Sequence, residues 1–140
     1  MKKAITLGLV VVFAGTVLMG CGGSKPAGKY GDAKMLIGKM TVSINSLTAS
    51  LEKAGGAKDV AKAFTAFTAS MKDLKPKIKE MEGKYPELKD KKNPPAELKM
   101  EMKGLEDASK KMLPVLFKTV KYQKDPEVAA AMKEMKNAWK

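Results

Sequence analysis

The chain has 140 residues, with 27 basic and 15 acidic side chains and no histidine, which gives a formal net charge of +12. Every basic residue is a lysine. The lack of arginine argues against nucleic-acid binding, because bidentate contacts to phosphates and bases depend on the guanidinium group. The lack of histidine, with a single cysteine and no motif for a nucleophile, phosphate loop or metal cluster, argues against catalysis. We therefore expect a binding or structural protein.

The first twenty residues have the order of a secretory signal. Lys2 and Lys3 form a short positive segment, and residues 4–19 are almost wholly apolar and carry no charge. This stretch is shorter than the ~20 residues of a membrane-spanning helix. A polar segment rich in Gly, Ser and Lys follows it directly. The pattern favours a cleaved signal peptide over residues 1–20, and an uncleaved signal anchor is the alternative.

Leu18-Met19-Gly20-Cys21 closes this segment and resembles a bacterial lipobox. The resemblance implies that the bond between Gly20 and Cys21 is cut and that the Cys21 thiol receives a diacylglycerol. It also implies a lipoprotein held on the periplasmic side of the cell envelope by acyl chains such as palmitate. Gly22, in place of Asp after the cysteine, resembles sorting to the outer membrane. The alternative is an unpaired structural cysteine, which would be a reactive liability in an exported chain.

Cleavage would leave residues 21–140 as the mature chain, and loss of Lys2 and Lys3 would lower the net charge from +12 to +10. Residues 21–31 are rich in Gly and predict a lipidated, flexible tether. Residues 32–140 predict one domain, of a size that buries about two-thirds of its unfolded surface.

Four segments of the mature chain, 36–51, 60–81, 98–116 and 128–139, carry apolar residues at steps of three and four. This spacing is typical of amphipathic helices, and sustained two-residue alternation is absent, so we predict no strands. The apolar positions are Leu36, Met40, Ile44, Leu47 and Leu51; Val60, Phe64, Phe67, Met71, Leu74, Ile78 and Met81; Leu98, Met102, Leu105, Met112 and Leu116, with Ser109 between; and Val128, Met132, Met135 and Trp139.

Glycines and prolines separate these helices. The glycines of segment 54–56 predict a left-handed C-cap and a tight reversal after the first helix. Segment 83–95 holds three prolines and predicts the long connection, with Pro95 opening the third helix. Asp125 predicts the N-cap of the fourth helix, with Pro126 at its first position.

The four apolar stripes can bury one another. We predict an all-α fold, an up-down-up-down antiparallel four-helix bundle after an N-terminal signal and flexible tether. The alternative is a pair of long helical hairpins that dimerises. Pro76 predicts a bent but unbroken second helix. After Pro114 the apolar stripe broadens, through Val115, Leu116, Phe117 and Val120.

Several short segments of the domain share one family pattern: Leu51-Glu52-Lys53-Ala54 with Ala57, Val60 and Ala63, then Leu88-Lys89-Asp90-Lys91, Gly104 and Asn137-Ala138-Trp139. In their order and spacing they resemble cytochrome b562, a periplasmic four-helix haem protein. That family holds haem with a methionine on the first helix and a histidine on the last. Those positions fall here on Thr41, one residue past Met40, and on Lys140. We therefore expect a relative without haem.

The favoured function is a non-enzymatic envelope lipoprotein, a helical binding or scaffolding module. Its lysines would favour an anionic envelope component or an acidic protein, and they cluster at Lys77, Lys79, Lys89, Lys91 and Lys92. Simple solubilisation of the helix surfaces is the alternative for these lysines. The alternative function is electron transfer through haem b, held by Met40 and Lys140. A third candidate is a chaperone or stress sensor that uses a basic, methionine-lined surface.

Two further groups of side chains have simpler explanations. The methionines, among them Met100, Met102, Met132 and Met135, are expected mainly in the core and not as copper ligands. The acidic pairs Glu80/Glu82, Glu97/Glu101 and Glu106/Asp107 are expected on the solvated helix faces.

Overall fold

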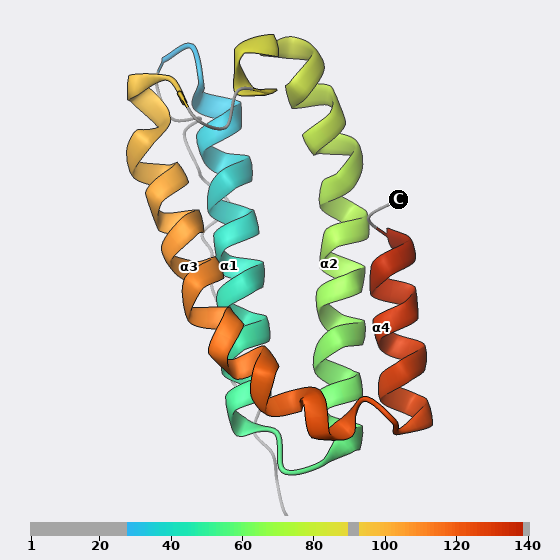
Figure 1. Cartoon of the computed structure of the whole chain (residues 1–140). Helices are drawn as coiled ribbons and strands as arrows, with labels where there is room; N and C mark the ends of the chain where they lie inside the picture. The colour runs from blue at the N-terminus through green and yellow to red at the C-terminus, as the bar shows by residue number, and fades with distance from the viewer. Residues whose placement is uncertain (1–27, 90–92, 139–140) are drawn as a thin grey trace, which may run out of the picture.

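A computed structural model describes residues 28–89 and 93–138 of the chain (Figure 1). It contains four α-helices: α1 (Gly31–Lys53), α2 (Ala57–Lys84), α3 (Lys99–Thr119) and α4 (Pro126–Ala138). Three short 3₁₀ turns, η1 (Pro86–Lys89), η2 (Ala96–Leu98) and η3 (Val120–Tyr122), lie in the connections. These described residues include no strand, and the four helices pack against one another. The prediction of an all-helical, four-helix fold is confirmed.

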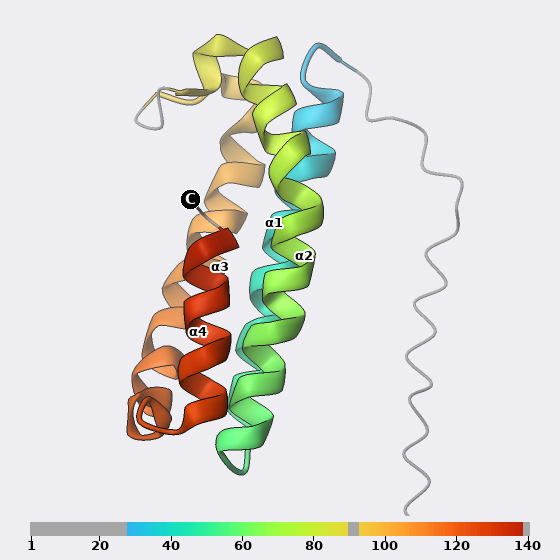
Figure 2. The same ribbon diagram turned by 90° about the vertical axis from the view of Figure 1, so that its right-hand side faces the viewer.

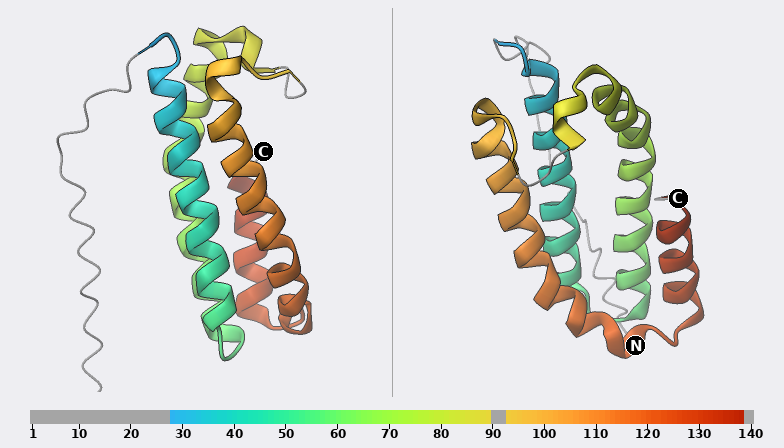
Figure 3. Two further views of the ribbon diagram at one scale, coloured as in Figure 1. Left: turned by 90° about the vertical axis from the view of Figure 1, so that its left-hand side faces the viewer. Right: turned by 45° about the horizontal axis from the view of Figure 1, so that its top comes forward.

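The helices form two layers, with α1 and α2 in one and α3 and α4 in the other (Figure 2). The closest backbone packing joins α1 to α2, α1 to α3 and α2 to α4, whereas α3 and α4 approach each other less closely. The first turns of α1 and α3 and the last turn of α2 lie at one end of the molecule (Figure 3). We call this end, formed by residues 28–31, 84–88 and 95–98, the entry end, because the chain enters the described domain there.

Helix α4 has 13 residues and α2 has 28, so α4 covers only the part of α2 farther from the entry end. The larger core lies where all four helices are present. Phe64, Val60 and Val128 are its most deeply buried side chains. Full burial of a side chain of this kind stabilises the fold by about 1.5–3 kcal/mol. The partly buried residues Ile44, Met112 and Met132 pack around them.

A second, smaller core lies at the entry end. It consists of Tyr30, Ala33, Ile37, Tyr85 and Leu98. The rings of Tyr30 and Tyr85 lie 5.2 Å apart between centroids and are inclined by 52°. This cluster joins the beginning of α1 to the end of α2 and the beginning of α3, and so closes the bundle where α4 is absent.

The turn between α1 and α2 differs from the prediction. Among the described residues only Gly28 has a positive φ, of 115°, so the expected left-handed cap at Gly55-Gly56 is wrong. Ala54 instead leaves the helix in an extended conformation, with φ −63° and ψ 119°. The N–H of Gly55 donates a hydrogen bond of 3.1 Å to Asp59 Oδ2, so a side chain at the start of α2 stabilises the reversal.

The other predicted helix ends agree more closely with the structure. The carboxylate of Asp125 accepts hydrogen bonds from the N–H groups of Glu127, at 2.9 Å, and Val128, at 3.3 Å, and α4 begins at Pro126 as predicted. Pro95 precedes one 3₁₀ turn, and α3 itself begins only at Lys99. Helix α2 continues through Pro76 without a break.

The predicted stripe of α3 faces the two cores: Met102 and Leu105 pack against the smaller one, and Met112 and Leu116 pack against the larger one. The fully buried positions of the helix lie beside that stripe. The buried residues are Ala108, Val115 and Thr119, whereas Met112 and Leu116 are only partly buried. Leu113 and Phe117 are exposed. The broad run of apolar residues around Pro114 covers more of the helix than its neighbours bury, so Leu113 and Phe117 remain on the surface.

Candidate functional site

Most of the residues expected to anchor the chain or to bind haem lie outside the described part. These are Gly20, Cys21 and Lys140. Met40 lies on α1 and is partly buried against the larger core. The candidate haem pair of Met40 and Lys140 therefore stays a prediction.

The predicted lysine cluster is described only in part. Lys77 and Lys79 are exposed on α2. Lys89 ends η1, and Lys91 and Lys92 lie outside the described residues. Of the methionines considered as metal ligands, Met102, Met132 and Met135 pack against the cores, as expected, whereas Met100 is exposed.

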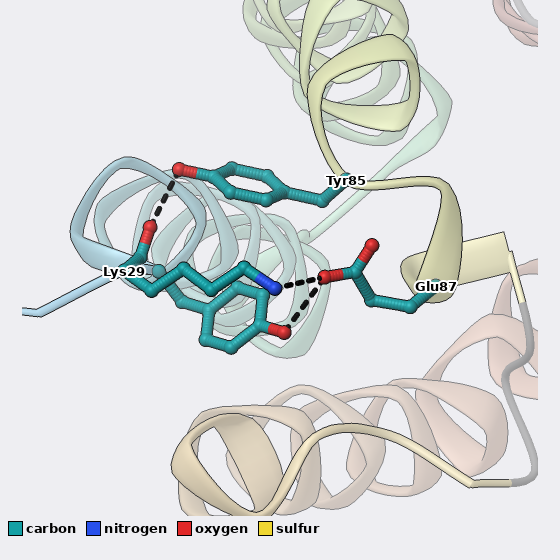
Figure 4. A network of polar contacts seen from close by, with 4 residues as sticks. Lys29, Tyr85 and Glu87 are labelled. Carbon is teal, nitrogen blue, oxygen red and sulfur yellow. Dashed lines mark hydrogen bonds and ion pairs between the residues drawn. The ribbon is translucent and has the colours of Figure 1, made fainter.

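A network of hydrogen bonds joins the beginning of α1 to the segment after α2 (Figure 4). Lys29 Nζ and the Tyr30 hydroxyl both donate to Glu87 Oε1, each at 2.8 Å. The Tyr85 hydroxyl donates to the backbone carbonyl of Lys29 at 2.6 Å. Two tyrosines with apolar bodies and polar tips thus connect the small core to the surface.

Charge strengthens this network. The hydrogen bond from Lys29, with smaller contributions from a backbone hydrogen bond and Tyr30, lowers the pKa of Glu87 to about 2. The same carboxylate, followed by Tyr30, raises the pKa of the Lys29 ammonium group. Both groups are therefore ionised at neutral pH. Ion pairs this exposed contribute little to global stability, so their main effect is to orient the chain where it enters the domain.

A second contact lies beside this network. Lys84 Nζ is 2.6 Å from Asp32 Oδ2 and 5.3 Å from the centre of the Tyr85 ring. The hydrogen bond to Asp32, and then the contact with Tyr85, raises the pKa of Lys84. The pair joins the first turn of α1 to the last turn of α2 and forms one wall of the groove described next.

A groove of about 310 Å³ runs between α1 and α2 near the entry end. Its apolar surface comes mainly from Met35, Leu36, Met81 and Tyr85, and its charged rim from Asp32, Lys39, Lys77, Glu80 and Lys84. No residue of α3 or α4 lines it. We call it the α1–α2 groove. Its volume is at the lower end of the range for small-molecule sites.

The groove combines apolar contact with positive charge. Methionine side chains adapt to ligands of irregular shape, and ammonium groups attract anionic ones. The rim carries three lysines and two carboxylates, and Lys84 is paired with Asp32, so the groove offers an apolar surface beside a small excess of positive charge.

The sequence pointed to only part of this site. It singled out Lys77 as a member of a lysine cluster but missed Lys39, Met35 and Tyr85. The signal available was the step of four from Met35 to Lys39, matched by the step of four from Lys77 to Met81. These steps place an apolar and a basic residue on one face of each helix. Only packing of α1 on α2 brings the two faces together.

One acidic pair also departs from expectation. Glu101 is only partly exposed, and its Oε1 lies 3.7 Å from Lys34 Nζ across α1 and α3. Its Oε2 is buried and accepts no hydrogen bond in the described part of the protein. The expectation of a fully solvated Glu97/Glu101 pair is therefore wrong for Glu101, because Lys34 draws its carboxylate toward α1.

Within residues 28–89 and 93–138, no group of three or more potential metal-ligating His, Cys, Asp or Glu side chains is present. None of the helices in these ranges is long and apolar enough to cross a membrane. Comparison of the chain with known protein families, curated proteins and solved structures finds no match. Inference about function therefore depends on the residues of this chain.

Proposed function

We propose that the protein is a lipid-anchored, non-enzymatic binding module of the bacterial cell envelope. The observation that carries the anchor is the lipobox-like segment 18–21, which follows an uncharged apolar stretch and holds the only cysteine of the chain. The described domain begins at Gly28, a few residues after this cysteine, which leaves a short tether between lipid and protein. In this proposal Gly22 directs the lipoprotein to the outer membrane.

In the same proposal, the domain is an antiparallel up-down-up-down relative of cytochrome b562 that works without haem. The helical content and the four packed helices are compatible with this relationship. The haem site of the family is replaced by a function at the α1–α2 groove, which is formed by other residues.

The ligand that we propose for the α1–α2 groove is a single anionic amphiphile. The support is the arrangement of Met35 and Met81 beside Lys39 and Lys77 in one groove. Apolar side chains would bury the tail and the lysines would attract an acidic head group. An acidic protein segment would satisfy the lysines but would leave the apolar surface largely uncovered.

The anchor is tested by fractionating cells that produce the natural chain or Cys21→Ala. The natural chain is expected with the membranes and to gain the mass of a diacylglycerol at Cys21, because more than one acyl chain gives stable anchoring. The variant is expected in the soluble fraction. Identical partitioning of the two forms, with no added mass, would refute the anchor.

The groove is tested by NMR with ¹³C-labelled methionine methyl groups. Titration with a short-chain phosphatidylglycerol below its micelle concentration is expected to shift Met35 and Met81, while Met132 and Met135 in the larger core serve as internal references. K39E/K77E should abolish these shifts, and K133E on α4 should leave them unchanged. Shifts produced by polyglutamate but not by the lipid would instead assign the groove to an acidic protein.

A further inference from the structure

A strip of large apolar side chains lies exposed on the second half of α3 and the turn that follows it. The exposed fractions are 52% for Leu113, 74% for Phe117 and 48% for Val120. Steps of four and three place these residues on one side of the helix, so they form a continuous strip and not scattered contacts. Exposed apolar surface that is continuous commonly marks an interaction site.

The charge around the strip is mainly positive. Residues 108–124 contain five lysines and no acidic residue. All five are exposed, at positions 110, 111, 118, 121 and 124. Lys110 pairs with Glu106 one turn earlier, and Lys121 Nζ lies 4.8 Å from the centre of the Tyr122 ring. Helical spacing puts Lys110 beside the strip, whereas Lys111 and Lys118 lie farther around the helix. We call the strip and these five lysines the α3 face.

Leu and Phe on one strip with lysines beside it are the composition of helices that lie in the interface of a membrane. We propose that the α3 face docks on a lipid bilayer that carries anionic head groups, with Leu113, Phe117 and Val120 inserted among them. This inference depends on the proposed lipid anchor, because a strip of three side chains needs a nearby tether to stay bound.

The length of the tether allows this arrangement. Seven residue steps separate Cys21 from Gly28 and span at most about 25 Å. Helices α1 and α3 pack side by side and both begin at the entry end (Figure 3). The entry point of the chain is therefore about one helix diameter, ~10 Å, from α3. The bundle can lie lengthwise on the bilayer with the α3 face toward the lipid. The α1–α2 groove then stays uncovered, because no residue of α3 lines it.

Charge favours a bilayer over a second copy of the chain. Pairing of two α3 faces would bring ten lysines together without an acidic residue from segment 108–124 of either copy. Like charges at an interface oppose association, whereas anionic head groups attract each of these lysines.

The test measures the depth of the strip in a bilayer. Mature chain, residues 21–140, carrying Trp139→Phe and Phe117→Trp, is coupled through the thiol of Cys21 to a maleimide lipid in vesicles with phosphatidylglycerol. Trp139 is the only natural tryptophan and Cys21 the only cysteine, so both the label and the linkage are unique. The matched control is Val42→Trp in the same background, since Val42 is 64% exposed on α1 and lies outside the α3 face.

Brominated acyl chains are expected to quench the fluorescence at position 117 and not at position 42. K118E/K121E should weaken docking by about fivefold or more for each lysine reversed. K39E/K77E, at the groove, should have no effect on the quenching. Phosphatidylcholine vesicles alone should support less quenching than vesicles with phosphatidylglycerol.

Equal quenching at both positions, or none at position 117, would overturn the proposal. The tryptophan at position 117 could instead become more buried as the density of protein on the vesicles rises, without quenching by the brominated chains. That result would assign the α3 face to contact with a second copy of the chain. Chemical coupling replaces cellular lipidation in this experiment. The α3 face can therefore fail while the natural anchor holds, and the anchor can fail in the fractionation experiment without changing this result.

Discussion

The hydroxyl of Tyr85, at the end of α2, donates a hydrogen bond of 2.6 Å to the backbone carbonyl of Lys29, just before α1. The two residues are 56 positions apart in the chain, so this bond closes the α1–α2 hairpin at the entry end. The ring of Tyr85 also packs in the small core and lines the α1–α2 groove. One side chain thus couples the point where the chain enters the domain to the wall of the candidate site.

Removal of this hydroxyl should weaken the entry end without unfolding the bundle. Tyr85→Phe keeps the ring and leaves the carbonyl of Lys29 without its donor, so we expect a loss of about 0.5–1.5 kcal/mol in the free energy of unfolding. Denaturant titration measures this change. Tyr122→Phe, at the opposite end, is the matched control, and an equal loss in both variants would contradict a specific role for Tyr85.

Acid should loosen the entry end through Glu87. The pKa of this carboxyl is about 2 in the folded protein, below its ordinary value of 4.5, so ionised Glu87 stabilises the local structure of the entry end above pH 4.5. That stabilisation is lost as the pH falls from 4.5 toward 2. The protection of the Lys34 amide, whose N–H is bonded to the Tyr30 carbonyl, should therefore fall across this range once its exchange rate is corrected for the intrinsic effect of pH.

Glu87→Gln should remove that part of the pH dependence and leave exchange at Lys34 faster at neutral pH as well. Glu106→Gln is the control, because the pKa of Glu106 is also lowered, by Lys110, but the pair lies on α3. If both variants flatten the acid response of Lys34 equally, the network of Lys29, Tyr30 and Glu87 does not control the entry end.

Phe64, in the larger core, and Phe117, on the surface of α3, should respond very differently to truncation. Phe64 is 1% exposed, and Phe64→Ala is expected to cost about 3–5 kcal/mol, because it removes apolar contacts and leaves a cavity. Phe117 is 74% exposed, and Phe117→Ala should change stability by no more than about 0.5 kcal/mol. Thermal or denaturant unfolding compares them, and a large loss at Phe117 would mean that the strip on α3 is structural.

Helix α4 should depend on its N-cap. Asp125→Ala removes the acceptor for the N–H groups of Glu127 and Val128 and should cost about 1 kcal/mol. Because α4 is short and packs mainly on α2, amide exchange in α4 should rise more than in α1. Asp125→Asn should restore most of the stability, and Asp107→Ala, an exposed change on α3, should have little effect. If Asp125→Asn does not recover the stability that Asp125→Ala loses, the loss does not come from the N-cap.

Local patterns predicted much of the fold. Val60, Phe64, Met71 and Leu74 were predicted to share one face of a helix, and they line the larger core. Asp125 and Pro126 marked the start of α4 to the residue. These predictions succeed because helical periodicity and capping depend on neighbours within one or two turns.

The candidate site was less accessible to this reasoning. Lys77 was predicted as a member of a lysine cluster because of its charged neighbours. Lys39 and Met35 lie about forty positions away from it in the chain, and no local pattern relates them to it. Phe117 was an ambiguous member of a broad apolar stripe, since several faces around Pro114 could have been buried. The sequence also suggested a glycine cap at Gly55-Gly56, where Ala54 and Asp59 form the turn instead.

By itself, the sequence determined the helical class, the four helices and the start of α4, because these follow from short-range spacing of apolar, capping and helix-breaking residues. It also supplies the whole case for the lipid anchor at Cys21. Only the tertiary structure decided that α1 packs against both α2 and α3, that Tyr85 closes the entry end and that Phe117 faces outward. The physical reason is that a helix with a broad apolar surface buries the side that its neighbours can cover, and short α4 leaves part of the bundle uncovered.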